Sequence, residues 1–249
     1  MNYVVAIPSY GRAKKLRAQT LDCLASEGID PQRITVFVAS EEERKEYEKV
    51  LLPDSYGRLV VGVKGLCQQL NFIRHYYPER TPILRMDDDV KRVKKLCPQR
   101  LGEIVERMFL LAQQEGVSYW GFYPCNNLYF CKDRVVIGKV FCVGPMNGFF
   151  NDRSLVYPDV SCQEDRWMSL TCYVKDGKTM RYEGLCPDTV YQTSSGLSDY
   201  RKQNLEANIQ HILLEFPELC HRRQKKKGNA DVDWKMVIQK KFPLFSEDS

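Results

Sequence analysis

The stretch PILRMDDDV, residues 82–90, ends a mainly apolar run with three consecutive aspartates. Adjacent carboxylates repel one another unless positive charge lies among them. Side chains alternate between the two faces of an extended backbone, so we expect Asp87 and Asp89 to converge while Asp88 points elsewhere. Carboxylate oxygens suit Mg²⁺ or Mn²⁺, which keep positions open for water and substrate phosphates. The alternative is an acidic turn that is neutralised by the cations following it, which are Lys91, Arg92, Lys94 and Lys95.

Strands and helices alternate along the first hundred residues. Short β-rich runs predict strands at residues 3–8, 33–39, 57–63 and 81–87. Amphipathic segments between them predict helices at residues 12–28, 40–51 and 64–77, with Ser40 as the N-cap of the second helix. This order implies a mainly parallel sheet that is covered by helices on both faces.

The second half of the chain is less regular. The apolar stripe of residues 100–116 predicts a helix that closes at Gly116. Strands are expected at residues 118–123, 127–132, 134–143 and 179–184, and a helix at residues 163–177 interrupts them. We therefore expect a smaller antiparallel section after the parallel one.

Length and composition favour one large domain with an appendage. The chain has 249 residues, of which 43% are apolar, so it can bury a substantial core. We expect one domain over residues 1–200, whose halves are residues 1–97 and 98–200, and a basic helical extension over residues 201–249. No apolar run reaches the roughly 20 residues that span a bilayer, and no secretory signal is recognisable. A cytoplasmic protein without a membrane partner is therefore predicted.

Cysteine usage favours reduced thiols. The ten cysteines are scattered through apolar stretches of a long chain, and none of them forms a C-x-x-C pair. Such a pattern is typical of buried thiols in a reducing compartment and not of a disulfide framework. A structural zinc site is not expected.

The excess positive charge lies near the C-terminus. Residues 200–241 hold ten Lys or Arg against five Asp or Glu, and the densest part is RRQKKK at residues 222–227. Such a patch suits a polyanion such as nucleic acid, through Arg222, Arg223, Lys225, Lys226 and Lys227. A solvated basic loop between two helices is an equally good interpretation.

A second candidate loop follows the first predicted strand. In IPSYGR, residues 7–12, the turn offers backbone amides, the Ser9 hydroxyl and Arg12 beyond the carboxyl end of the strand, where open α/β sheets bind ligands. The loop is neither a Walker loop nor a G-x-G-x-x-G loop, so ATPase and dinucleotide-binding functions lose support. An ordinary strand-to-helix turn remains the alternative.

Taken in order, these motifs resemble a known family. VVAIPSYGR, VFVASEEE, GLCQQLNFIR, ILRMDDDV and EDRWMSL together look like a glycosyltransferase of the GT-A fold, over roughly residues 3–200. The details are most similar to the TET/JBP-associated glycosyltransferases, which glycosylate hydroxymethylated pyrimidines in DNA, notably in phages and in base J synthesis. The resemblance implies a hexosyltransferase that uses a UDP-sugar, with UDP-glucose favoured, and Mn²⁺ or Mg²⁺. In a phage the enzyme would work in the host cytoplasm.

The resemblance also implies roles for individual residues. It assigns Asp87 and Asp89 to the metal and Glu164 and Asp165 to the catalytic base, with Asp165 preferred. An alternative for both acids is capping of the helix that they begin. The donor-binding residues that it implies are Pro8, Ser9, Tyr10, Arg12, Gly65, Asn71, Arg85, Asp87 and Asp88. Many GT-A enzymes add a late histidine to the metal, but here His211 and His221 lie in the tail and His75 on an early helix. We therefore expect either weak metal binding or a coordination sphere completed by the donor diphosphate alone.

The expected acceptor is 5-hydroxymethylcytosine or a related hydroxymethylated pyrimidine in double-stranded DNA. Its hydroxyl must reach the donor, which favours a nucleotide turned out of the duplex, and one in-line displacement would invert the anomeric carbon. Tyr123, Tyr129 and Trp167 are candidates to stack on the base, although aromatic residues are more often core. Residues 141–155, with Phe149 and Phe150, form either the floor of an acceptor pocket or a core strand. Residues 194–201 are either a lid with Arg201 as a clamp or a linker. A polysaccharide or protein acceptor, and an inactive domain that binds nucleic acid, remain alternatives.

Overall fold

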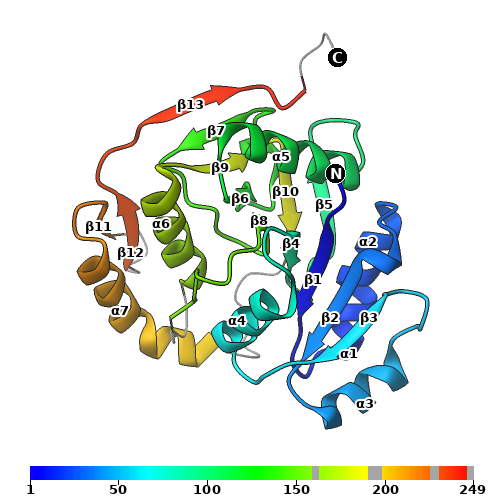
Figure 1. Ribbon diagram of the computed structural model, residues 1–249. Coiled ribbons are helices and arrows are strands. Elements are labelled where there is room, and N and C mark those ends of the chain that lie inside the picture. Colours follow the sequence, from blue (N-terminus) through cyan, green and yellow to red (C-terminus); the bar gives the residue numbers. More distant parts are fainter. Residues whose placement is uncertain (159–162, 190–197, 225–229, 246–249) are drawn as a thin grey trace.

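A nine-stranded mixed sheet runs through the protein, with helices on both faces, in a computed structural model (Figure 1). The structure describes residues 1–158, 163–189, 198–224 and 230–245. The strand order is β13-β7-β9-β6-β8-β4-β1-β2-β3. The strands are β1 (Val4–Pro8), β2 (Ile34–Val38), β3 (Arg58–Val61), β4 (Pro82–Met86), β6 (Tyr119–Phe122), β7 (Val135–Gly138), β8 (Met146–Phe150), β9 (Thr179–Tyr182) and β13 (Gln239–Phe242).

The first half is the predicted parallel array. Strand β1 pairs in parallel with β2 and β4, and β2 pairs in parallel with β3. The helical elements between them are α1 (Ala13–Leu16), η1 (Arg17–Leu21), α2 (Asp22–Ser26), η2 (Pro31–Arg33), α3 (Glu41–Val50) and α4 (Leu66–Tyr76). The Ser40 side chain caps α3 by accepting a hydrogen bond from the backbone N–H of Glu43, as predicted. One feature was not predicted: the first helix is interrupted by a π-helical turn, η1.

Antiparallel pairing enters in the second half. Strand β8 lies antiparallel between β4 and β6, whereas β6 and β9 are parallel. Helices α5 (Leu101–Glu115) and α6 (Glu164–Asp176) match their predicted ranges, and Gly116 ends α5 in the left-handed conformation. Strands β5 (Arg92–Lys95) and β10 (Leu185–Asp188) form a separate antiparallel pair. The mixed α/β fold class is therefore confirmed.

Two apolar clusters lie on opposite faces of the sheet. The larger one joins α1, α2 and α5 to the sheet through side chains such as Leu16, Leu24 and Val105. The other joins α4 and α6 through side chains such as Ile73, Met168 and Phe149. Residues that alternate along β1 and β4 divide between the two clusters, which is the pattern of strands covered on both sides.

Two predicted strands differ from the structure. Residues 127–132 do not form a strand: Leu128–Phe130 form a short 3₁₀ helix, η3, because the Asn127 side chain accepts a hydrogen bond from the N–H of Tyr129. The strand predicted at residues 134–143 ends as β7 at Gly138, where φ is +128°. A residue with a side chain rarely adopts this backbone conformation, so the glycine marks the end of the strand.

The helical extension is correct only as far as α7 (Ser198–Glu215). Beyond it the prediction is wrong, because the chain forms the hairpin β11 (Cys220–Gln224) and β12 (Ala230–Trp234), and then β13 joins the main sheet beside β7. Val232 and Trp234 alternate into a core shared with Ile209 and Leu170. This period of two is a strand signal that the basic composition of the segment obscured. The described part of this C-terminal segment thus packs against the rest of the protein.

The nine cysteines in the described part of the chain are free thiols, and their reduced state in a cell stays a prediction. Burial raises the pKa of Cys142 and Cys172 to about 12, so these thiols stay protonated and unreactive near neutral pH. Among the described residues, no helix combines the length and the apolar character needed to cross a bilayer.

One surface ion pair gives a testable pH dependence of stability. Burial opposes ionisation of Asp152, but hydrogen bonds from Lys175 and Ser154 lower its pKa to about 2. Because the folded-state pKa lies below the unfolded value, the ionised carboxylate stabilises the protein above about pH 4, and this stabilisation is lost as the pH falls towards 2. We expect Asp152→Asn to lower the free energy of unfolding by about 1–2 kcal/mol at pH 7, as measured by urea denaturation. The difference from the wild type should shrink below about pH 3; a constant difference would contradict this account.

Candidate functional site

The candidate site lies where the neighbouring strands β1 and β4 end. Because these strands are parallel, Pro8 and Met86 deliver the loops that follow them to the same edge of the sheet. The Ser9 hydroxyl donates a 2.6 Å hydrogen bond to Asp88. The two loops that the sequence marked as candidates are therefore in direct contact.

The aspartate triplet forms a turn that other elements hold in place. Thr20, in the π-helical turn η1, donates to the Asp87 carbonyl at 2.8 Å and accepts from the N–H of Val90 at 3.0 Å. The N–H of Asp87 donates to the Pro145 carbonyl at 2.8 Å. These bonds bracket the triplet from both ends. A π-helical turn often occurs at a functional site, and here it aims Thr20 at the triplet.

The expected alternation of the three side chains is wrong. Strand β4 ends at Met86, so the triplet is not on extended backbone. Asp88 and Asp89 share Arg12, which contacts them at 2.7 Å and 3.3 Å. Asp87 pairs instead with Arg85. The cations that neutralise the triplet come mainly from elements before it; among the predicted group, Arg92 and Lys94 pair with Asp188.

Asp88 is the buried member of the triplet. Its side chain is fully covered and bonded to Ser9 and Arg12, and Ser9 also bonds the Tyr47 hydroxyl at 2.7 Å. Burial raises the pKa of Asp88 to about 6, although Arg12 and Ser9 act in the opposite direction. Tyr47 further accepts a hydrogen bond from the N–H of Arg12, so it holds the loop after β1 in position.

Asp89 remains ionised at the mouth of the site. Burial works against the charge, but hydrogen bonds from Lys15 and Thr189 lower the pKa of Asp89 below its usual value. The Lys15 ammonium lies 3.0 Å away and the Thr189 hydroxyl 2.9 Å away. The ionised carboxylate can therefore bind a cation. In this structure Lys15 and Arg12 provide the positive charge beside it.

Arg85 links the aspartate triplet to the loop that contains Gly144. Its guanidinium is buried, pairs with Asp87 and donates to the Gly144 carbonyl at 3.2 Å. Burial would lower the pKa of Arg85, but the negative charges of Asp87 and Glu164 raise it above its ordinary value. This side chain therefore stays charged, and it interacts electrostatically with both the aspartate triplet and Glu164.

Asp165 contacts the other backbone polar group of Gly144. The N–H of Gly144 donates to Asp165 at 3.0 Å, while its carbonyl accepts from Arg85. Glu164 and Asp165 occupy the first turn of α6, where the helix dipole favours acids, so the predicted capping role has a structural basis. A role of Asp165 as a base is compatible with this geometry and stays a prediction.

The hairpin β11–β12 is attached beside Asp165. Asp231 accepts a 3.0 Å hydrogen bond from Gln163 and a 2.8 Å charged hydrogen bond from Arg166, the residues that flank the acidic pair. Arg166 also donates to the Val232 carbonyl. The hairpin therefore meets the helix turn that carries the candidate base.

The predicted basic run begins in strand β11 of this hairpin. Arg222 and Arg223 are exposed, and they pair with Glu206 and with Asp233. Lys225, Lys226 and Lys227 lie outside the described residues, as do residues 194–197 of the predicted lid. The side chain of Arg201 is not described either.

The other predicted donor-binding residues differ in their exposure and in their contacts. Tyr10 is exposed, with the Lys64 ammonium 5.6 Å from its ring centre. Gly65 begins α4 with φ of +103°, and an added Cβ would collide with the Gln68 side chain. Asn71 uses both ends of its amide on the backbone of Tyr157. The structure gives Asn71 a tethering function, and its part in binding a donor stays a prediction.

The aromatic residues that were predicted to stack on the acceptor base or to form its pocket differ in their exposure. Phe149 is buried in the core from strand β8, and Trp167 packs edge-on against Phe216. Tyr123 is partly covered by the guanidinium of Arg181, whereas Tyr129 is 86% exposed. Of the stacking candidates, Tyr129 is the one that the structure leaves open to a partner.

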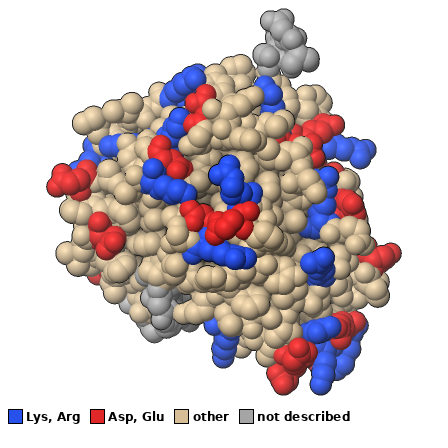
Figure 2. All heavy atoms as spheres, in the orientation of Figure 1, with Lys and Arg blue, Asp and Glu red and all other residues tan. Residues whose placement is uncertain are grey.

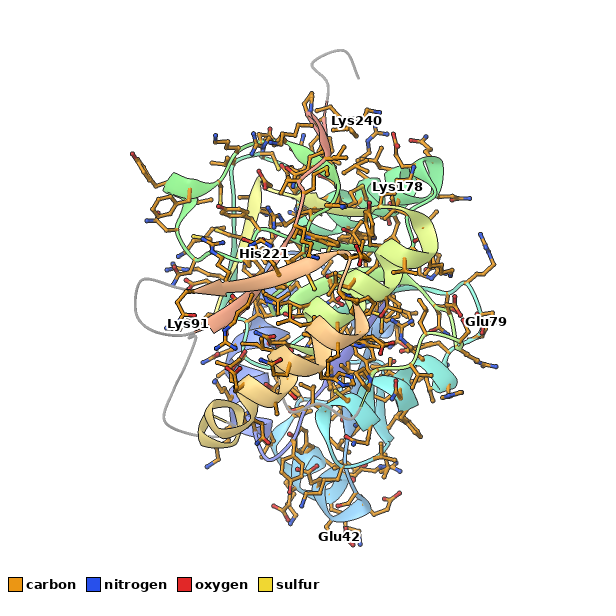
Figure 3. The ribbon with its side chains drawn as sticks, turned by 90° about the vertical axis from the view of Figure 1, so that its left-hand side faces the viewer. Glu42, Glu79, Lys91, Lys178, His221 and Lys240 are labelled. Atoms are coloured by element: carbon orange, nitrogen blue, oxygen red, sulfur yellow. The ribbon has the colours of Figure 1, made fainter. Side chains whose placement is uncertain are left out.

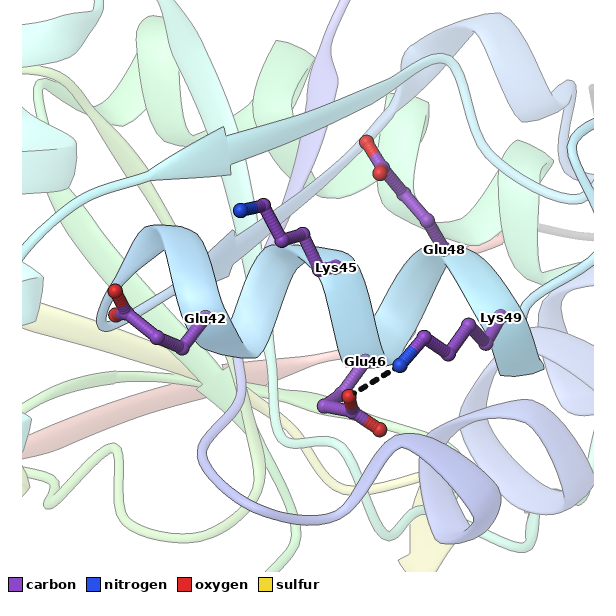
Figure 4. Close-up of a pocket in the computed structure, with 5 residues that line it drawn as sticks. All are labelled: Glu42, Lys45, Glu46, Glu48 and Lys49. Carbon is purple, nitrogen blue, oxygen red and sulfur yellow. Dashed lines mark hydrogen bonds and ion pairs between the residues drawn. The ribbon is translucent and has the colours of Figure 1, made fainter.

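A shallow hollow elsewhere on the surface is unrelated to this site. It lies over the outer face of α3 between Glu42, Lys45, Glu46, Glu48 and Lys49, and Figure 4 shows these side chains spread along the helix. Lys49 and Glu46 form an exposed ion pair at 2.6 Å. The hollow is a solvated charged helix face, which offers no enclosed surface for a ligand.

The sequence did not identify four of the residues that build the site. Lys15, Thr20, Tyr47 and Thr189 all bond the triplet or the loop after β1. Lys15 and Thr20 lie on a helix whose starting loop was already a candidate. A search of its first turns for polar side chains facing that loop would have found them. Thr189 comes from a distant segment, and its contact depends on the tertiary fold.

Comparisons with known proteins agree with this architecture. No protein-family model matches the chain, and no curated protein matches it in sequence. The structure is similar to mannosyltransferase PcManGT from Pyrobaculum calidifontis, solved with GDP-Man and Mn²⁺, with a TM-score of 0.58 and 15% identity. The match covers 86% of this chain and 64% of that one, so the chain spans less than two thirds of that protein.

A second solved structure is similar over most of both chains. Glucosyl-3-phosphoglycerate synthase from Mycobacterium tuberculosis, with Mn²⁺ and UDP-glucose, gives a TM-score of 0.56 at 10% identity and covers 96% of this chain and 88% of its own. Both neighbours have the GT-A fold, which confirms the fold predicted for this chain. A fold alone does not determine an activity, so the function is argued from the site.

Proposed function

We propose that this protein is a metal-dependent glycosyltransferase, which moves glucose from UDP-glucose to the hydroxyl of a hydroxymethylated pyrimidine in DNA. The observation that carries the proposal is the joining of three parts at one sheet edge. The loop after β1 contacts the aspartate triplet through Ser9 and Arg12, and Arg85 links the triplet to the Gly144 peptide, which binds Asp165. The two candidate donor-binding loops and the candidate base are thus connected through Arg85 and Gly144.

The residues present suit a divalent cation held together with a diphosphate. Asp87 and Asp89 offer hard carboxylate oxygens, the ligands that Mg²⁺ and Mn²⁺ prefer. The positive groups gathered on the triplet show that this position favours a cation. Among the described residues, no group of three or more His, Cys, Asp or Glu could hold a metal by itself. A divalent cation held here would need oxygens of the donor diphosphate to complete its coordination.

We assign a separate role in the glycosyl transfer to each charged side chain of the site. The bound cation would supply Lewis-acid stabilisation of the leaving diphosphate. Arg12 and Lys15 are placed to move from Asp89 to the donor phosphates, and Arg85 orients Asp87 through their ion pair. Asp165, or Glu164 beside it, removes the proton from the acceptor hydroxyl as the anomeric carbon is attacked. A single displacement of this kind inverts the configuration.

Charge and position support the DNA acceptor. Strand β11 carries Arg222 and Arg223, the described part of the basic run, and the hairpin β11–β12 is bonded to Gln163 and Arg166 on either side of the candidate base. On the face seen in Figure 2, acidic and basic side chains are interspersed and acidic groups gather near the centre. Phosphate contacts from the basic run would fix the position of the duplex on the protein.

The decisive experiment offers the protein several acceptors. We would incubate it with UDP-glucose, Mn²⁺ and DNA containing 5-hydroxymethylcytosine or 5-hydroxymethyluracil, and follow the mass of the DNA nucleosides. Transfer to these bases supports the proposal. Transfer to a polysaccharide or protein and not to DNA would overturn the acceptor while leaving the enzyme class. DNA binding without turnover of any UDP-sugar would identify an inactive binding module.

The basic run gives a prediction about salt. We expect replacing Arg222, Arg223 and Lys225–Lys227 with glutamine to reduce the slope of log Kd for duplex DNA against log salt, by about 0.9 for each lost phosphate contact. The measurement is fluorescence anisotropy of a labelled duplex at several NaCl concentrations. Lys45→Gln/Lys49→Gln on the exposed face of α3 is the control. An unchanged slope in the hairpin variant would exclude a role of the run in binding phosphates.

A further inference from the structure

Tyr129 and Phe130 form an exposed aromatic pair that the proposed chemistry does not use. Their side chains are 86% and 56% exposed, and their rings meet edge to face with centres 5.3 Å apart. Large aromatic side chains seldom lie together in water without a partner. This pair therefore points to a contact with something outside the chain.

The backbone presents the pair rigidly. Asn127 caps the short helix η3 by accepting from the N–H of Tyr129, and the N–H of Cys131 donates to the Leu128 carbonyl at 2.9 Å. The Lys94 ammonium donates to the Asn126 carbonyl. The aromatic side chains are thus held outward by bonds within the loop and from β5, and not by apolar packing.

A short chain of contacts joins this loop to the candidate site. Lys94 bonds both Asn126 and Asp188, and the Asp188 carbonyl accepts from the N–H of Lys91 at 2.8 Å. The next residue, Thr189, donates to Asp89. Hydrogen bonds and ion pairs thus connect the loop that carries the aromatic pair to the aspartate triplet.

The charges around the pair are mainly positive. Lys91, Arg92 and Lys132 are exposed on the segments that flank it. Figure 3 shows Lys91 on the flank of the molecule opposite Glu79. Arg92 pairs with Asp188, and Asp133 accepts a hydrogen bond from Tyr182, so these two acids are already engaged. Exposed aromatic rings bordered by cations are the combination that recognises nucleic acid, because the rings stack on bases while the cations meet phosphates.

We infer that Tyr129 and Phe130 form a wedge that enters duplex DNA where the acceptor nucleotide is turned out, while Lys91 and Lys132 hold the adjoining phosphates. This inference rests on the proposed DNA acceptor. A base that leaves the stack exposes its neighbours, and an inserted aromatic side chain replaces the lost stacking. A single-stranded acceptor needs no such replacement, so the pair matters for duplexes alone.

The test compares Tyr129→Ala/Phe130→Ala with the wild type in two assays. The first measures the fluorescence of 2-aminopurine placed at the acceptor position of a duplex, where turning the nucleotide out removes its stacking, without a sugar donor. The second measures glucose transfer from UDP-glucose to the same sequence with 5-hydroxymethylcytosine at that position, as a duplex and as a single strand. Leu214→Ala, a change at an 80% exposed apolar side chain on α7, is the control.

We expect the wild type and the control to increase the 2-aminopurine emission, and the double variant to lose that increase. Transfer to the duplex should fall at least tenfold in the double variant, while transfer to the single strand changes less than twofold. Equal transfer to the duplex by the wild type and the double variant would overturn the wedge, as would an equal fall on both DNA forms.

The two proposals fail in distinguishable ways. A wild-type protein that glycosylates single-stranded DNA but never raises 2-aminopurine emission refutes the wedge alone. A wild-type protein that glucosylates a glycan and no form of DNA refutes the proposed acceptor, and with it the wedge. In that case a fall in glycan transfer by the double variant would assign the aromatic pair to sugar binding instead.

Discussion

Asp165→Asn is expected to lower kcat for glucose transfer by a factor of about 10² to 10⁴, because an amide cannot accept the proton of the acceptor hydroxyl. The affinity for UDP should change less than about threefold. Asparagine keeps an oxygen that can accept from the N–H of Gly144, so the loop contact of the native carboxylate is preserved. Single-turnover kinetics and a UDP titration measure the two quantities separately.

This variant also separates the two interpretations of the acidic pair. If Asp165 only caps α6, the asparagine variant should lose a little stability and less than tenfold in turnover. Glu164→Gln, tested in parallel, shows which of the two carboxylates acts as the base. Asp54→Asn, a change at an exposed acid in the loop after α3, controls for the loss of one negative charge.

Asp89→Asn is expected to lower turnover by a factor of about 10² to 10³ at a saturating concentration of Mn²⁺. Stabilisation of the leaving diphosphate by a carboxylate-bound cation accounts for several kcal/mol of transition-state energy. The variant should fold, because an asparagine oxygen can still accept the Thr189 hydrogen bond and the two cations on Asp89 lie partly in solvent: Arg12 is 48% exposed and Lys15 29% exposed. The concentration of Mn²⁺ giving half-maximal turnover should rise as well.

A purely structural role of Asp89 makes a different prediction. Removal of an acidic residue that merely neutralises Lys15 would shift the melting temperature and leave the Mn²⁺ dependence of turnover unchanged. The circular dichroism melting curve and the Mn²⁺ titration of the same sample therefore distinguish the two roles. Asp54→Asn, at the exposed acid in the loop after α3, is the control for the loss of one negative charge.

The parallel half of the fold was predictable because its signals are local. The strands at residues 3–8 and 81–87 are short apolar runs, and the helix at residues 40–51 carries its own cap in Ser40. The π-helical turn η1 and the hairpin β11–β12 were not predictable in this way. The former places Thr20 against the triplet, and the latter depends on burial of Val232 and Trp234 against helices that lie far away in the sequence.

The candidate site was predicted by residue type more accurately than by geometry. The approach of Ser9 and Asp88 follows from two parallel neighbouring strands, a rule that the sequence pattern could apply. The pairing of Asp88 with Asp89 through Arg12 does not follow, because it depends on the point where β4 ends. The Gly144 peptide between Arg85 and Asp165 likewise depends on a loop whose shape only the tertiary structure fixes.

The central claim is that the aspartate triplet and the loop after β1 bind a nucleoside diphosphate together with a divalent cation. Isothermal titration of UDP in the presence of Mn²⁺, and again after EDTA, tests this most directly. The account predicts binding with Mn²⁺ that weakens at least tenfold after EDTA, and a similar loss in an Asp87→Asn/Asp89→Asn variant. Binding of UDP that is equally strong with and without the metal, or that survives in the double variant, would contradict it.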